Sequence, residues 1–241
     1  MKKELLIFGS SGALGEGVTK VFIEKNYDRI YLFDFKHKNI AQTNVKQIIV
    51  KDLSVEENVK KAFSEIPPSK ETIFFLFSTI GGFTGGKKIW ETETGDFDRM
   101  INMNLRTSFL ISKYFSRLVK ESHSGSICLT SAYTGLIAEP GKAVYGTSKA
   151  ALIHLIKSLA EEGKEINLSA NAIAPFIIDT PVNREWMKDA DFGEWIKPSE
   201  IGDFVESIFQ NYNLSSGNIY QLKNRLFENK LFGEHKNINY I

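Results

Sequence analysis

The fold of this chain is decided near its N-terminus, where the sequence reads Leu5-Leu6-Ile7-Phe8-Gly9-Ser10-Ser11-Gly12-Ala13-Leu14-Gly15-Glu16-Gly17. Its first four residues form a short apolar run, which is typical of a strand buried on both faces of a parallel sheet. The glycine-rich turn leads into a helical pattern with apolar residues at Val18, Val21 and Phe22. A strand, a glycine turn and a helix in this order form the context in which such glycines indicate phosphate binding.

Glycine lets this turn close tightly and brings the backbone near a pyrophosphate. The start of the helix adds free N–H groups and the positive end of its dipole. A plain glycine–serine turn is the alternative, and the flanking strand and helix favour the binding function. The predicted binding residues of the turn are Gly9, Ser11, Ala13, Leu14 and Gly15.

Further apolar runs along the chain predict more strands of the same kind, at residues 30–33, 45–50, 73–77, 126–129, 168–174 and, after a turn, within 215–222. They alternate with helical patterns, the longest at residues 96–120 and from residue 145 onward, with no internal repeat and no linker. We therefore predict an α/β fold, a Rossmann-like doubly wound parallel sheet with helices on both faces, in one domain covering residues 1–241.

Ligands of such sheets bind at the carboxyl ends of the strands. The residues at the predicted ends are Gly9, Asp34, Asp52, Ser78, Thr130 and Pro175. Asp34 lies about 20 residues after the glycine turn, the spacing of an acid that binds the adenosine ribose. Its carboxylate would repel a 2′-phosphate, so NADH is predicted over NADPH, although Lys36 and Lys38 weaken this preference. A residue that merely closes the strand is the alternative for Asp34, and Asp52 either holds the adenine edge or simply lies in its loop.

Two aromatic residues are candidates for substrate contact. Phe83 lies between glycine pairs in Gly81-Gly82-Phe83-Thr84-Gly85-Gly86, a loop that allows close approach to a ligand or acts as a flexible lid. Its ring either stacks on a flat substrate or packs the loop down. Trp186 lies in residues 182–197, which we expect to form a loop or short helices over the site.

Tyr145 and Lys149 are the candidate catalytic pair. They open a helical pattern through Leu159, and residues four apart share one face of a helix. A cation held near a phenol favours the phenolate and lowers the pKa of the phenol, which prepares it to exchange a proton in a reaction. An amphipathic tyrosine beside a solvated lysine is the alternative.

Composition limits the partners that we expect. The 241 residues carry a net charge of +1, so no field is predicted that would attract nucleic acid or an anionic membrane. The apolar runs are too short for a signal peptide or a membrane span. A single cysteine, Cys128, excludes an internal disulfide and suits a reducing compartment. We expect a soluble cytoplasmic protein that acts on a small molecule and has no metal site.

Taken together, these motifs resemble the short-chain dehydrogenase/reductases over essentially the whole chain. The resemblance rests on the glycine turn, Asp34, Asp52-Leu53, Asn104-Leu105, the Tyr145/Lys149 pair and residues 175–180. It implies that Tyr145 is the proton donor, that Lys149 lowers the pKa of Tyr145 and binds the nicotinamide ribose, and that Asn104 holds a water in the proton relay. The further cofactor contacts that it implies are Leu53, Ser78, Ile80, Gly81, Thr130, Pro175, Ile178 and Thr180.

Within that family, the sequence is most similar to the dihydropteridine reductases. It shares with them the glycine turn after the first strand and the glycine-rich loop from Gly81 to Gly86, which we call the glycine loop. It also shares residues 179–184, 190–192 and 215–217. As in those enzymes, Ala132 stands where most of the family has a substrate-binding serine. Ser131 cannot simply replace it if the strand is still extended there, because neighbouring residues then face opposite sides. Asn104 follows the ordinary family pattern instead, and Phe83 stands where the pteridine reductases have tryptophan.

The resulting hypothesis is an NADH-dependent short-chain reductase that transfers hydride to a flat conjugated substrate, quinonoid dihydropterin. An ordinary carbonyl or alcohol reductase that uses Ser131 is the first alternative, and a non-catalytic dinucleotide-binding sensor is the second. The resemblance and the apolar helices at residues 100–118 and 145–159 also predict a homodimer or homotetramer.

Overall fold

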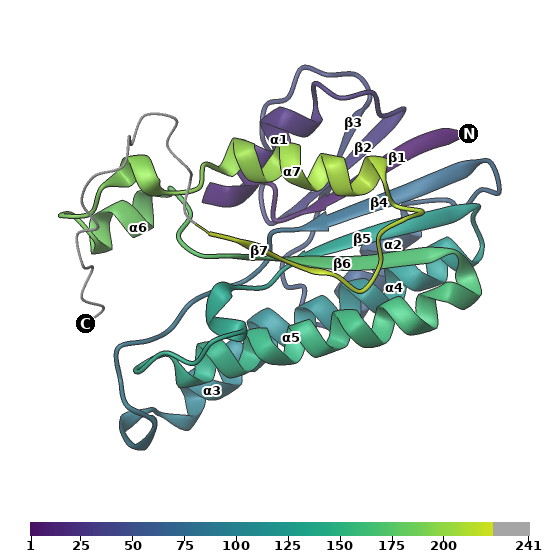
Figure 1. Cartoon of the computed structure of the whole chain (residues 1–241). Coiled ribbons are helices and arrows are strands. Elements are labelled where there is room, and N and C mark those ends of the chain that lie inside the picture. Colours follow the sequence, from purple (N-terminus) through teal and green to yellow (C-terminus); the bar gives the residue numbers. More distant parts are fainter. Residues whose placement is uncertain (224–241) are drawn as a thin grey trace.

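The computed structural model describes residues 1–223, and they form one parallel sheet of seven strands (Figure 1). The sheet order is β3-β2-β1-β4-β5-β6-β7, which confirms the predicted doubly wound topology. The strands are β1 (Lys2–Phe8), β2 (Arg29–Asp34), β3 (Val45–Ile49), β4 (Thr72–Ser78), β5 (Ser124–Thr130), β6 (Leu168–Pro175) and β7 (Ile219–Leu222). The order reverses between β1 and β4, and a crevice for ligands opens at such a switch point.

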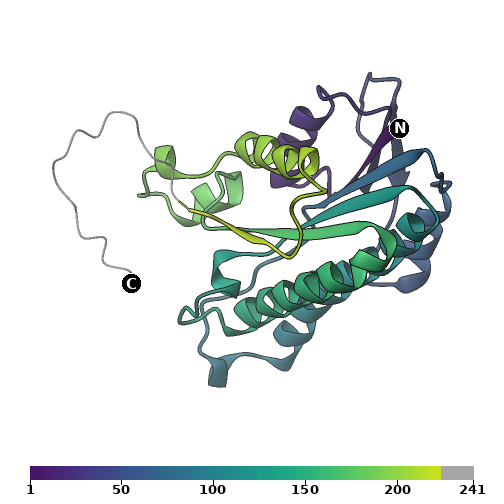
Figure 2. The same cartoon turned by 45° about the vertical axis from the view of Figure 1, so that its right-hand side comes forward.

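Helices cover both faces of the sheet, as Figures 1 and 2 show from two directions. Helices α1 (Ala13–Phe22) and α7 (Pro198–Gln210) lie on one face. Helices α2 (Glu56–Ser64), α4 (Thr107–Lys120) and α5 (Ala143–Glu162) lie on the other. The short helices α3 (Thr94–Met100) and α6 (Pro181–Trp186) lie in the connections beyond the carboxyl ends of β4 and β6.

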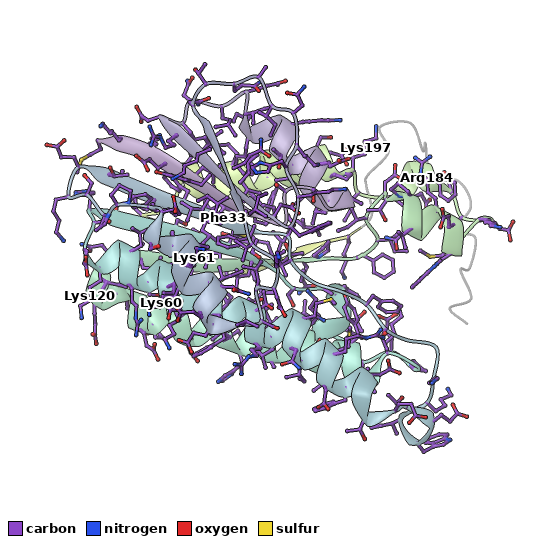
Figure 3. All side chains as sticks on the ribbon, turned by 180° about the vertical axis from the view of Figure 1, so that it is seen from behind. Phe33, Lys60, Lys61, Lys120, Arg184 and Lys197 are labelled. Carbon is purple, nitrogen blue, oxygen red and sulfur yellow. The ribbon has the colours of Figure 1, made fainter. Side chains whose placement is uncertain are left out.

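Two apolar cores result, one on each face, and β1 contributes to both. Leu6 and Phe8 pack toward α2, α4 and α5, while Leu5 and Ile7 pack toward α1 and α7. Successive strand residues point to opposite faces, so a strand between two layers of helices must be apolar at every position. This explains the continuous apolar runs of the sequence. Figure 3 shows Phe33 amid the packed side chains, with Lys60 and Lys61 on the outside of α2.

The long helix predicted at residues 96–120 is interrupted. A π-helical turn, η2 (Ile101–Arg106), joins α3 to α4. A π-helical turn contains about one residue more than a turn of α-helix, and such turns often occur at functional sites. Here the turn contains Asn104, which is completely buried. Residues 182–197 form α6 and the short η5 (Phe192–Glu194), in agreement with the prediction. The part of the predicted domain after Lys223 lies outside the described residues.

Candidate active site

A cleft of about 690 Å³ opens at the carboxyl ends of β1, β2 and β4. It brings together the predicted cofactor-binding residues Gly9, Ser11, Ala13, Leu14, Gly15, Asp34, Asp52, Leu53, Ile80 and Gly81. Residues that the sequence did not single out also line it, among them Thr79, Arg99 and Met103. Thr79 directly follows β4, whereas Arg99 and Met103 reach the cleft only through the packing of α3 and η2 beside that strand.

The glycine turn is built for close approach of a ligand. Gly9 has a φ of +82°, a conformation that side chains disfavour. A Cβ on Gly15 would lie 1.9 Å from the carbonyl oxygen of Gly9, so only glycine fits where α1 starts under the turn. Gly12 caps α1 without any side-chain hydrogen bond. The hydroxyl of Ser11 is buried at the cleft without a partner. The backbone N–H groups at the start of α1 and the Ser11 hydroxyl are donors that fit the phosphates of a dinucleotide.

Asp34 is buried at the end of β2 and faces the glycine turn. One carboxylate oxygen accepts hydrogen bonds from the backbone N–H of Ser11 and from the hydroxyl of Ser10 (3.2 Å). The other accepts one from the N–H of Phe35 at 2.7 Å. Of the two nearby lysines, Lys38 is paired with Glu16 at 2.6 Å. The other, Lys36, lies over the ring of Phe35, with its ammonium 5.5 Å from the ring centre.

Asp52 also lines the cleft, at the mouth beyond β3. Its carboxylate accepts from the N–H and the hydroxyl of Ser54 at 2.8 and 2.7 Å. These two hydrogen bonds lower the pKa of the Asp52 carboxyl. The geometry supports the role of a residue that shapes its loop.

Tyr145 and Lys149 lie one turn apart on α5, with the ammonium 6.0 Å from the centre of the phenol ring. Lys149 is buried and donates to the carbonyl oxygen of Thr130 at 2.8 Å. Burial lowers the pKa of Lys149 to about 8 and raises the pKa of Tyr145 to about 12, with a smaller contribution from the carboxylate of Glu139. Burial of the phenol thus raises the pKa of Tyr145 in this structure, and the lowering effect expected from Lys149 stays a prediction.

Asn104 positions the loop beside this pair. Its amide donates to the hydroxyl of Ser148 at 2.9 Å and to the carbonyl of Gly82 at 3.1 Å, and it accepts from the N–H of Gly82 at 2.8 Å. The loop is thereby held against Lys149, since a Cβ on Gly81 would lie 2.8 Å from the ammonium nitrogen. The relay water expected at Asn104 stays a prediction, because the amide is engaged in positioning.

Ser131 does not face the cleft. Its hydroxyl donates to the backbone carbonyl of Lys149 at 3.0 Å, and the residue is 2 % exposed. Ala132 is in an extended conformation, with φ of −155° and ψ of 157°. Because the chain is still extended here, the two side chains point to opposite sides. Ser131 is thus not brought to the position of the missing serine.

Three aromatic rings meet at the mouth of the site. Phe83 contacts Tyr145 edge to face, with ring centres 4.9 Å apart, and its centre lies 5.4 Å from that of Trp186. Phe83 is 39 % exposed and Trp186 62 % exposed. The ring of Phe83 therefore packs the loop against Tyr145 and still presents an open face, so the two roles that the sequence left open are compatible.

The segment after β6 places Trp186 at this mouth. Thr180 caps α6 by accepting from the N–H of Asn183, whose side chain in turn donates to the carbonyl of Ile178 at 2.8 Å. Arg184 forms two hydrogen bonds with Asp179, at 2.6 and 2.8 Å. These local bonds fix the direction in which α6 leaves the sheet. Four predicted cofactor contacts, Thr130, Pro175, Ile178 and Thr180, lie on this side and not in the main cleft.

Ser78, Tyr145 and Lys149 are the other predicted cofactor contacts that do not line the main cleft. Ser78 is buried at the end of β4, where its carbonyl accepts from the hydroxyl of Thr130 at 2.7 Å. The bond ties the ends of β4 and β5 together. Its position favours a structural role.

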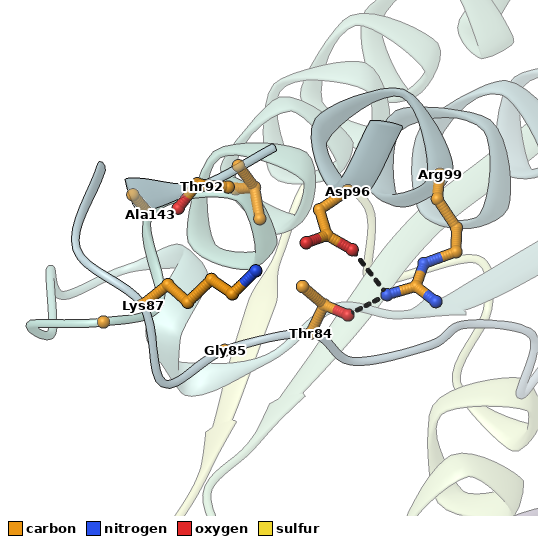
Figure 4. A pocket seen from close by; sticks show the side chains of 9 residues that line it. Thr84, Gly85, Lys87, Thr92, Asp96, Arg99 and Ala143 are labelled. Carbon is orange, nitrogen blue, oxygen red and sulfur yellow. Dashed lines mark hydrogen bonds and ion pairs between the residues drawn. The ribbon is translucent and has the colours of Figure 1, made fainter. Parts of the chain in front are cut away.

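A smaller pocket of about 200 Å³ lies behind the glycine loop (Figure 4). Arg99 donates to Asp96 at 2.9 Å and also to the hydroxyl of Thr84, and Lys87 points into the same space. Arg99 lines the larger cleft as well. These bonds anchor the far end of the glycine loop on α3.

Within residues 1–223, no helix is long and apolar enough to cross a lipid bilayer. The same residues contain no group of three or more His, Cys, Asp or Glu side chains arranged to hold a metal ion.

Comparisons with known proteins agree with this geometry. The model of the protein family described as short chain dehydrogenase matches residues 3–191 of this chain. A dihydropteridine reductase of Dictyostelium discoideum is 33 % identical over 205 residues, which cover 84 % of this chain and 86 % of that protein. Carbonyl reductase family member 4 of Xenopus laevis is 26 % identical, over 85 % of this chain and 90 % of that one. The solved structure of ElxO with NADP bound superimposes with a TM-score of 0.79 at 23 % identity, covering 92 % and 97 % of the two chains.

Proposed function

The chain belongs to the short-chain dehydrogenase family, and within it we propose an NADH-dependent reductase of a flat conjugated substrate, quinonoid dihydropterin. The observation that carries the proposal is the mouth of the site. Two exposed aromatic rings lie there, Phe83 against Tyr145 and Trp186 against Phe83, whereas the Ser131 hydroxyl does not replace the serine missing at Ala132. A flat heteroaromatic ring can stack on such rings, with a gain of about 0.5–1.5 kcal/mol for each good aromatic contact.

The cofactor would be held by the glycine turn, with its adenosine ribose at Asp34. When bound, the nicotinamide supplies the hydride. Preference for NADH is supported by the buried Asp34 carboxylate and by the pairing of Lys38 with Glu16, which lessens the attraction of that lysine for a 2′-phosphate.

The proton would come from Tyr145. With a pKa raised to about 12, the phenol is protonated at neutral pH, so it carries the proton that the reaction needs. Lys149 carries its charge below a pKa of about 8, and at 6.0 Å from the ring it stabilises the phenolate that donation leaves behind. Tyr145 would thus begin the reaction as a neutral phenol, and the Lys149 ammonium would stabilise the phenolate that remains after proton transfer.

The absence of the serine fits this substrate class. Removal of one donor to a developing oxyanion costs a carbonyl reductase about 2.7–4 kcal/mol of transition-state stabilisation. A quinonoid dihydropterin is an electron-poor diimine that needs less polarisation, so Ala132 costs less with it.

A carbonyl reductase is the second candidate, supported by the similarity to carbonyl reductase family member 4 and by Asn104, which follows the ordinary family pattern. In that case Ser131 would have to turn away from the carbonyl oxygen of Lys149 toward the substrate. Ser131→Ala should then abolish ketone reduction, whereas a pterin reductase should keep most of its activity.

The test is NADH oxidation by the purified protein with freshly prepared quinonoid dihydropterin, beside a panel of simple ketones. We expect turnover of the pterin and its loss in Tyr145→Phe. Trp186→Ala should raise the KM for the pterin several-fold without changing the KM for NADH. Trp90→Ala is the matched control, because Trp90 is 80 % exposed and lies in none of the clefts described above. Reduction of ketones without pterin turnover above background would reject the proposal.

A further inference from the structure

Two segments that the sequence shares with the dihydropteridine reductases, residues 179–184 and 190–192, are joined by one arginine. The guanidinium of Arg184, labelled in Figure 3, donates to both carboxylate oxygens of Asp179, at 2.6 and 2.8 Å. It also lies over the ring of Phe192, 4.8 Å from the ring centre. A planar guanidinium can make both contacts at once, whereas a lysine ammonium cannot bind a carboxylate through two parallel bonds. We call Asp179, Arg184 and Phe192 the Arg184 cluster.

The Arg184 cluster is connected to the buried part of the chain. The ring of Phe192 packs against Trp195, with ring centres 4.7 Å apart, and Trp195 is buried. The N–H of Ile196 donates to the carbonyl of Ile177 at 3.1 Å, and the N–H of Asp179 donates to the carbonyl of Ile196 at 2.8 Å. The two ends of the segment that carries α6 are therefore held together beside the sheet.

Trp186 depends on this arrangement for its place at the mouth of the site. It is the last residue of α6, which has only six residues, and a helix this short is not stable by itself. The indole is 62 % exposed and contacts the ring of Phe83. Residues two apart lie on nearly opposite faces of a helix. Arg184 can thus hold one face of α6 against the chain while Trp186 presents the other toward Phe83.

We propose that Arg184 is a positioning residue for the substrate site, whose contacts with Asp179 and Phe192 hold Trp186 beside Phe83 and so preform a surface for a flat ring. The substrate part of this role rests on the proposed function, whereas the place of Trp186 is a property of the free protein. A preformed surface does not have to be ordered when the substrate binds, so loss of the Arg184 cluster should weaken substrate binding more than it slows the chemical step.

Fluorine NMR of the substrate-free protein tests where Trp186 lies. The chain has three tryptophans, so 5-fluorotryptophan gives three ¹⁹F signals, and the Trp186 signal is the one missing in Trp186→Phe. Phe83→Leu removes the neighbouring ring and gives the chemical shift of Trp186 without it. We expect Arg184→Lys and Asp179→Asn to move the Trp186 signal toward that value. Phe192→Tyr, which keeps the ring under the guanidinium, should leave the signal in place.

The matched control is Arg117→Lys. The Arg117 guanidinium lies 5.1 Å from the centre of the Tyr114 ring on α4, and Arg117 lines neither cleft, so the same kind of contact is changed away from the site. An equal shift of the Trp186 signal in this control would overturn the proposal, as would an unchanged signal in both Arg184→Lys and Asp179→Asn. Two variants are used so that one that fails to fold leaves the other to decide.

Turnover separates positioning from a general loss of structure. Arg184→Lys should raise the KM for quinonoid dihydropterin by about three- to tenfold, the loss expected for one good aromatic contact, while kcat and the Kd for NADH stay within about twofold. An unchanged KM together with a moved Trp186 signal would also overturn the proposal. If the protein reduces no pterin, the proposed substrate is wrong, and the NMR result still decides whether Arg184 places Trp186.

Discussion

At the scale of single residues, burial shifts the pKa values of the proposed catalytic pair, Tyr145 and Lys149. The two side chains lie one turn apart on α5, as the spacing predicted, whereas the effect of Lys149 on the pKa of Tyr145 stays a prediction. Lys149 is 3 % exposed and has one carbonyl partner, so its own charge is costly. The pair therefore combines an acid that resists ionisation with a base whose pKa is lowered to about 8.

Lys149 makes the stability of the protein depend on pH. Below about pH 8 its charged form is buried at full cost. Between about pH 8 and its ordinary value of 10.5, the unfolded chain binds the proton that the folded chain has released, so the free energy of unfolding rises with pH. From about pH 7.5 to 9.5 we expect the wild-type protein to gain about 2 kcal/mol relative to Lys149→Met. Urea denaturation at several pH values measures the difference, and parallel curves for the two proteins would contradict the expectation.

At the scale of elements, the turns position the site. The glycine turn after β1 was recognised from its sequence context. The π-helical turn between α3 and α4 was not, because its apolar spacing continues that of the flanking helices. It delivers Asn104 to Gly82 and Ser148, from elements far apart in the chain.

The glycine turn gives a sharp test of cofactor binding. Gly15→Ala would place a methyl group 1.9 Å from the carbonyl oxygen of Gly9, so the turn must move. We expect the Kd for NADH, measured by calorimetry, to rise at least about tenfold, and stability to fall by about 1–3 kcal/mol. Gly95→Ala is the matched control within α3, since nothing lies within 4 Å of its added Cβ. It should bind NADH normally, and equal binding by both variants would refute the role of the turn.

At the scale of the whole molecule, most of the apolar surface of α4 and α5 is used inside the chain. Leu110, Phe115, Leu152 and Ile156 pack into the core that faces the sheet. The apolar excess that suggested a dimer is thus smaller than the sequence indicated. Phe109, on α4, remains 49 % exposed.

We expect a homodimer that buries Phe109. Phe109→Glu should shift the protein to a monomer at micromolar concentration, because a charge in an apolar contact is costly. Light scattering measures the mass. Leu214→Glu serves as the control, since Leu214 is 81 % exposed beyond α7 and should leave the assembly unchanged. A wild-type protein that is monomeric at the same concentration would contradict the expected homodimer.

Local sequence determined the sheet, the glycine turn and the cleft at the strand ends. Strand and helix periods, and the demands of glycine at Gly9 and Gly15, act within a few neighbouring residues, so they can be seen without the fold. The tertiary structure alone decided that Ser131 faces the backbone of Lys149, that Phe83 meets Trp186, and that the N–H of Gly86 meets the carbonyl of Gly141. These features depend on how distant elements pack. The protonation of Tyr145 depends on the same packing, because the cost of a buried charge is set by everything that surrounds it.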